Sequence, residues 1–128
     1  MNISHLQYLT VPVADHAKAR DFYVDKLGFD LLVDVPGPHG RFVMVSPKGA
    51  STGLVLTDYE VDGLSFGGPL SFQLHTTDVD ADVEALRAAG VAVEDPQELP
   101  WGRTASIKDP DGNGIGLLEP SEYGNWPR

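Results

Sequence analysis

The chain has 128 residues, the length of one ordinary domain, and 41% of them are apolar, which is enough for a core. Its formal net charge of −10 opposes binding to phosphate backbones and to anionic lipid, so we expect neither nucleic acid nor a membrane as partner. The absence of cysteine excludes disulfides, thiolate metal sites and a cysteine nucleophile. We see no signal-peptide pattern and no membrane-length apolar run, so we expect a cytoplasmic protein.

The first half of the chain predicts one strand, one helix and three more strands. Residues 4–13 alternate with strand periodicity, and Asp15 is expected to cap a helix that ends near Leu27, before Gly28. Turns rich in Gly and Pro then separate three further segments of strand character. These predicted strands are residues 30–35, 41–46 and 53–57.

The same order of elements returns after a segment rich in Gly, Asp and Pro at about residues 59–69. Residues 70–77 alternate as a strand, and a helix is expected from Val79 to about Ala89, ending at Gly90. Three strands are expected to follow near residues 91–97, 103–108 and 114–119.

The repeated order indicates an internal duplication. KLGFDLLVD at 26–34 matches AAGVAVED at 88–95, each with a helix end, a glycine and a new strand. We therefore predict an α+β fold in one domain, residues 1–128, with βαβββ modules at about 1–58 and 70–120 and a tail at 121–128. The modules are expected to form a curved, barrel-like mixed sheet with the helices outside and a central cleft.

Each helix can cover only one face of its sheet, so the alternation also predicts which side chains face a cleft. The pairs Leu6/Tyr8, Phe72/Leu74 and Ile115/Leu117 are expected to face the helices. The opposite face is unusually polar for a sheet interior, and it either lines a cleft or is simply solvated. Its predicted members are His5, Gln7, Leu9, Ser71, Gln73, His75, Gly116 and Leu118.

Three stretches resemble the vicinal oxygen chelate superfamily, which includes glyoxalase I, extradiol dioxygenases, fosfomycin-resistance enzymes and bleomycin-resistance proteins. They are HLQYLTVPVADHAKARDFYVDKLGFDL at 5–31, LHTTDVDADVEALRAAGV at 74–91 and IKDPDGNGIGLLEP at 107–120. The resemblance covers nearly the whole chain and implies a duplicated βαβββ fold and a homodimer. It is weak evidence for a particular activity, because this fold hosts several chemistries.

The resemblance also implies where a divalent metal would bind in the family's enzymes. The first-strand histidine matches His5, but the other ligand positions fall on Ser71, Gly116 and, on the fourth strand, near Val55. A catalytic metal needs about three donor side chains, and glycine and valine offer none. We therefore expect no metal and no cofactor. A substitute site from His5, Gln73 and His75 is the less favoured alternative.

The motif DPDGNG at 109–114 also resembles the start of a calcium-binding EF-hand loop. The position for its bidentate carboxylate is Pro120, and the flanking segments predict strands, so a turn is the expected structure. Asp78, Asp80 and Asp82 lie where a helix begins, which favours a structural role at the helix N-terminus.

The predicted ligand-binding residues combine the polar face with aromatic and charged side chains. Trp101, in a loop between strands, is expected either to touch a ligand or to join the core, and Arg103 either meets an anionic group or forms a surface salt bridge. The set is His5, Gln7, Phe42, Met44, Gln73, His75, Trp101, Arg103 and Gly116, with the catalytic residues unassigned.

Three functions remain open from the sequence. The first is a metal-independent protein that sequesters an aromatic or hydrophobic natural product, as in antibiotic resistance. The second is a glyoxalase-like lyase or isomerase with His5 or His75 as general base, with or without a metal. The third is a regulatory or interaction domain without a ligand.

Overall fold

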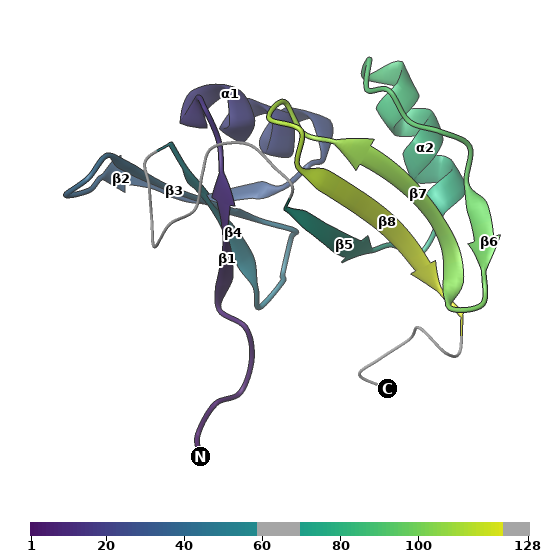
Figure 1. Cartoon of the computed structure of the whole chain (residues 1–128), viewed down its shortest axis with the longest axis horizontal. Coiled ribbons are helices and arrows are strands. Elements are labelled where there is room, and N and C mark those ends of the chain that lie inside the picture. The colour runs from purple at the N-terminus through teal and green to yellow at the C-terminus, as the bar shows by residue number, and fades with distance from the viewer. Residues whose placement is uncertain (59–69, 122–128) are drawn as a thin grey trace. The chain divides into compact units, whose positions relative to one another are not determined.

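The computed structural model describes residues 1–58 and 70–121 (Figure 1). The predicted linker at 59–69 and all but the first residue of the predicted tail lie outside this range. No helix in the described part is both long and apolar enough to cross a membrane. The elements are β1 (Tyr8–Pro12), α1 (His16–Asp21), the π-helical turn η1 (Phe22–Lys26), β2 (Asp30–Pro36), β3 (Arg41–Ser46), β4 (Gly53–Thr57), β5 (Ser71–His75), α2 (Val79–Ala88), β6 (Gln97–Leu99), β7 (Gly102–Lys108) and β8 (Gly114–Pro120).

The strands form two four-stranded mixed sheets with the same topology. Their orders are β1-β4-β3-β2 and β5-β8-β7-β6, and the first pair of each sheet is parallel while the others are antiparallel. This repetition confirms the α+β class and the predicted duplication. Within the described residues the sheets stay separate and form no closed barrel. One unit comprises residues 1–58 with 110–112, and the other comprises 70–109 with 113–121.

The helix of the first unit begins as predicted and ends differently. The Asp15 carboxylate accepts hydrogen bonds from the amides of Ala17 and Lys18 at 3.0 and 3.2 Å. We expected one regular helix to Leu27, whereas the last turn widens into η1 before Gly28 takes a left-handed conformation (φ 73°).

The first strand is shorter than predicted, and its faces are the reverse of the prediction. Val11 pairs in register with Leu56, and both are fully buried, whereas Leu6 is 57% and Tyr8 43% exposed. The helix side is identified by Arg20 of α1, which donates to Asp34 of β2 at 2.9 Å. Asp34 pairs with Val43 and shares its face.

Leu9 and Val11 therefore lie on the helix side, and Tyr8 and Thr10 lie on the open side. The strand ladder with β4 starts only at Tyr8, so the alternation of residues 4–7 carried no information about the faces.

The faces of the second sheet are as predicted. The amide of Val79 in α2 donates to the Glu119 side chain at 3.0 Å, which marks the helix side of β8. Ile115 and Leu117 alternate with Glu119 on that side and are buried. The open side carries, by register, Ser71, Gln73, His75, Gly116 and Leu118.

The predicted strand at 91–97 was wrong except at its last residue, because β6 spans only Gln97–Leu99. Arg87, in the last turn of α2, donates to the backbone carbonyl of Val93 at 3.0 Å and to the Asp95 carboxylate at 2.8 Å. The Arg87 side chain holds the segment beside the helix, and Pro96 has no N–H to donate to a neighbouring strand.

The β7–β8 connection is a turn built by its own acidic residue. The buried Asp109 carboxylate accepts from the Asn113 amide at 2.9 Å and from its side-chain nitrogen at 2.8 Å. Asp111 accepts from the Ala14 amide at 2.8 Å. Strands flank the turn on both sides, so the EF-hand alternative is wrong.

Candidate functional site

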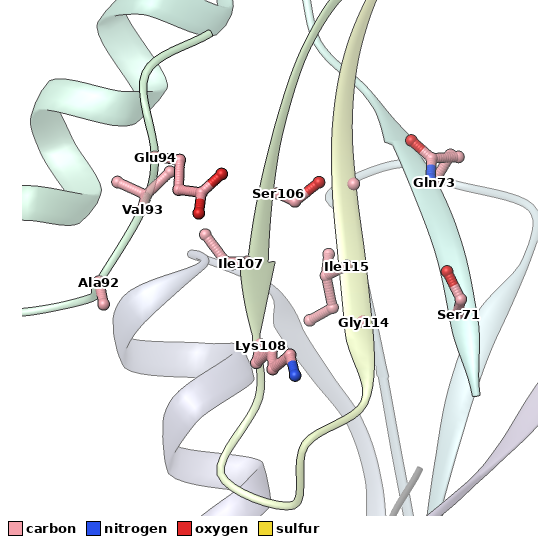
Figure 2. A pocket seen from close by; sticks show the side chains of 11 residues that line it. Ser71, Gln73, Ala92, Val93, Glu94, Ser106, Ile107, Lys108, Gly114 and Ile115 are labelled. Carbon is pink, nitrogen blue, oxygen red and sulfur yellow. The ribbon is translucent and has the colours of Figure 1, made fainter. Parts of the chain in front are cut away.

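Strands β5, β7 and β8 of the second sheet line a hollow. Its volume is about 580 Å³, and residues 92–94 border it beyond β7 (Figure 2). In the figure Ser71 and Gln73 project from β5, Ser106 from β7, and Glu94 from the far side of β7. The lining residues of the three strands are Ser71, Gln73, Ser106, Ile107, Lys108, Gly114, Ile115 and Gly116.

Gly116 is one of these lining residues, and the side chain of Gln73 lies across it. A Cβ placed on Gly116 would be 2.0 Å from Oε1 and 2.4 Å from Nε2 of Gln73. The two residues are register partners on β5 and β8. Gln73 therefore occupies part of the space that the missing side chain at Gly116 leaves.

His75 and Trp101 are both accessible in the second unit. His75 ends β5 on the open side, in register with Leu118. Trp101 lies at the turn between β6 and β7 and is 50% exposed, so it is not a core residue. Its backbone carbonyl accepts from the amide of Ser121 at 3.0 Å, which anchors the turn without using the indole.

Arg103 does not reach the hollow. It lies on the helix side, where Nε and Nη2 donate to both carboxylate oxygens of Asp80 at 3.0 and 2.8 Å, and Nη1 donates to Glu98 at 2.9 Å. These bonds raise the pKa of Arg103 and hold the pKa of Asp80 below its ordinary value. Of the two sequence alternatives for Arg103, the structure shows the salt bridge.

The open side of the first sheet is apolar and aromatic. Tyr8 and Phe42 meet edge to face, with ring centroids 6.4 Å apart and planes at 80°. Met44 and Val55 are register partners on the same side, and a Cβ on Gly53 would be 2.6 Å from the terminal methyl of Met44. Phe42 and Met44 were predicted ligand contacts. Tyr8 was not among the predicted ligand contacts. Val11 and Val13 are fully buried on the other side of the strand, so Tyr8 lies on the open side.

His5 and Gln7 precede the first sheet and do not belong to its face. His5 is exposed and lies 2.7 Å from the hydroxyl of Ser4, measured from Nδ1. The second sheet shows which residue of the first sheet corresponds to Ser71. Tyr8 pairs with Gly53 in the first sheet as Ser71 pairs with Gly114 in the second. Tyr8 therefore stands in the first sheet where Ser71 stands in the second, and His5 lies three residues before it.

The same comparison relates other positions in the two sheets. Val55 pairs with Thr10 as Gly116 pairs with Gln73, so Tyr8, Val55, Ser71 and Gly116 are equivalent positions in the two sheets. Two of these side chains have no donor atom and the other two are hydroxyls. Over residues 1–58 and 70–121, no three His, Cys, Asp or Glu side chains gather closely enough to hold a metal. These residues do not fit a divalent metal.

Comparisons with known proteins agree with this architecture. The sequence model of the Glyoxalase/Bleomycin resistance protein/Dioxygenase superfamily matches residues 3–117. TnmS3, described as an antibiotic binding protein from Streptomyces sp. CB03234, is 54% identical with a TM-score of 0.89, over 94% of this chain and 99% of its own. A glyoxalase/bleomycin resistance protein from the same strain is 51% identical with a TM-score of 0.80, over 90% and 100%.

A more distant relative extends the same match. The uncharacterized protein YetH of Bacillus subtilis is 33% identical over 91% of this chain and 99% of its own. Together with the two repeated sheets, these matches establish the family. The chain belongs to the glyoxalase/bleomycin resistance protein/dioxygenase superfamily.

Proposed function

We propose that this protein binds a small aromatic or hydrophobic natural product of the antibiotic class and holds it without converting it. The observation that carries the proposal is the 54% identity, over 94% of the chain, to a protein described as antibiotic binding. Two features of the described residues support it independently.

The first feature is the apolar open side of the first sheet. Tyr8, Phe42 and Met44 provide two aromatic rings and a flexible thioether. Such side chains pack well against planar and apolar ligands. Each 100 Å² of apolar surface removed from water contributes roughly 2.5 kcal/mol before the costs of association. Tyr8 is 43% exposed and so has surface left to bury.

The second feature is the chemistry at the family's metal positions. Valine at 55 and glycine at 116 provide no ligand, so a reaction that needs a bound divalent metal lacks its coordinating groups there. The rival function is a lyase or isomerase with a histidine base. His75 remains its candidate, since His5 lies outside the sheet.

The test is a thermal-shift screen of aromatic antibiotics, followed by calorimetry and mass spectrometry of the recovered ligand. We expect at least one compound to raise the melting temperature with micromolar or better affinity and to be recovered unchanged. Recovery of a chemically altered compound would overturn sequestration in favour of the enzyme. A panel that produces no stabilisation at all would favour the interaction-domain alternative.

We also propose a homodimer and a cytoplasmic location. The outer strand β2 exposes three apolar side chains, Leu31, Leu32 and Val35, at 45%, 51% and 48%. An exposed apolar edge strand is usually covered by a partner. Light scattering after size-exclusion chromatography should give twice the 13.8 kDa chain mass, and cell fractionation tests the location.

A further inference from the structure

We propose that Gln73 selects the ligand of the second sheet, and that it recognises a planar ring with an adjacent carbonyl and N–H, as in a lactam or imide. This inference rests on the proposed binding function and names the ligand chemistry that the hollow accepts. Three observations carry it: the position of Gln73, the two glycines on the facing strand β8, and the lack of a hydrogen-bond partner for the Gln73 amide among the described residues.

Gln73 is the longest uncharged polar side chain on the open side of β5, and its amide lies over Gly116 of β8. By register, Gly114 and Gly116 lie on the same side of β8, between Ser71 of β5 and Ser106 of β7. A planar ring can therefore lie against the β8 backbone beside the Gln73 amide. The terminal amide of Gln73, at the Gly116 position, then stands at the edge of such a ring.

The Gln73 amide makes no hydrogen bond to any other described residue. Its carbonyl oxygen and its NH₂ group both remain available, side by side on one planar edge. A lactam presents the complementary pair, an acceptor oxygen next to a donor N–H. Two parallel bonds of this kind are how glutamine side chains read an adenine edge.

The substitution Gly116→Ala should displace the Gln73 side chain without replacing it. Gly116 lies in a strand and has no left-handed backbone angle, so alanine fits its conformation. The new methyl group would overlap the Gln73 amide. Because the overlapping atoms are the end of a flexible side chain, we expect that side chain to rotate away from the strand. Thr104→Ala is the control. It removes a small group on the open side of β7, in register with Leu118 and outside the residues that line the hollow.

The experiment uses 2-quinolone and its N-methyl derivative as probes, in nuclear magnetic resonance titrations of the full chain labelled with nitrogen-15. Both probes are planar and have the carbonyl, but only 2-quinolone has the adjacent N–H. We expect 2-quinolone to bind about tenfold more tightly and to shift the Gln73 side-chain NH₂ signals.

That preference should disappear in Gln73→Ala and in Gly116→Ala, and it should persist in Thr104→Ala. Adding Gly116→Ala to Gln73→Ala should change nothing more, because the substitution acts through the Gln73 amide. Thermal melts of each variant confirm that it is folded.

Equal affinity for the two probes, or a preference that survives Gln73→Ala, would overturn the inference. Binding of a panel antibiotic when neither quinolone binds would overturn the lactam class and leave the proposed function standing. If neither the quinolones nor any antibiotic binds, the proposed function itself fails.

Discussion

The two sheets share one topology and differ in what their open sides present. The first sheet offers Tyr8, Phe42 and Met44 around the buried Val55, whereas the second offers serines, glycines and the Gln73 amide. A duplicated backbone has thus kept its register while the two open faces acquired different chemistry. The first open side is therefore mainly apolar, and the second presents groups that can form hydrogen bonds.

The largest expected effect on stability comes from placing a glutamate at Val55 and at Gly116, which are equivalent positions in the two sheets. Val55 is 3% exposed, so Val55→Glu buries a carboxylate without a partner and should destabilise the fold by about 3 kcal/mol or more. Gly116→Glu faces the hollow, where only the end of Gln73 must move, and should cost less than about 1 kcal/mol. Urea denaturation measures both, and equal losses would contradict the contrast between the faces.

The next effect concerns ligand affinity at the apolar face. Tyr8→Ala removes a half-exposed ring and its edge contact with Phe42, and it should weaken binding of a panel antibiotic by about tenfold. Leu32→Ala is the control, because it removes an apolar side chain that is 51% exposed on β2, outside the Tyr8–Phe42 pair. Calorimetry should show no change for the control. Equal losses in both variants would mean that the aromatic pair has no special role.

A smaller effect concerns the pH dependence of stability in the two units. The guanidinium groups of Arg41 and Arg20 hold the pKa of Asp34 below its ordinary value of 3.8, and Arg103 does the same for Asp80. A lowered carboxyl pKa stabilises the fold above the unfolded value and loses that contribution as the pH falls through the folded value.

Asp34→Asn should therefore lower the melting temperature at pH 7, and the difference from the parent protein should shrink below about pH 4. Asp80→Asn should follow the same trend with a smaller amplitude, since its side chain is 61% exposed against 18% for Asp34. A difference that grows towards low pH would contradict the assignment.

The smallest expected effect is that of His75→Ala. As a binding protein the chain should keep its affinity for a panel antibiotic within about twofold, because an exposed histidine contributes little. The recovered ligand should be intact in both proteins. Ligand conversion by the parent protein that disappears in His75→Ala would instead identify a general base.

The sequence predicted most of the fold through local signals. The caps at Asp15 and Asp78, the glycines that end the helices and the Asp109 turn were all readable, because each depends on hydrogen bonds a few residues apart. Most strands were placed within a residue or two. The segment at 91–96 was misjudged because Arg87 binds it, and no local pattern reports that contact.

The candidate site was predicted less well, because it depends on register. The open side of the second sheet was identified, but His5 was taken for a face residue and Tyr8 was not. Arg103 was placed among the ligand contacts, although its register partner Glu119 assigns it to the helix side. A shift of one residue moves a whole strand to the opposite face, and nothing in an isolated strand reveals its partner.

The sequence by itself thus determined the duplicated modules, their helix caps and turns, and the lack of metal-donor side chains at Val55 and Gly116. Only the tertiary structure decided that Tyr8 stands where Ser71 stands in the repeat, and that the Gln73 amide covers Gly116. Caps and turns are set by neighbours along the chain. Faces and side-chain overlaps are set by strands far apart in the sequence, whose pairing is chosen by burial of the whole sheet.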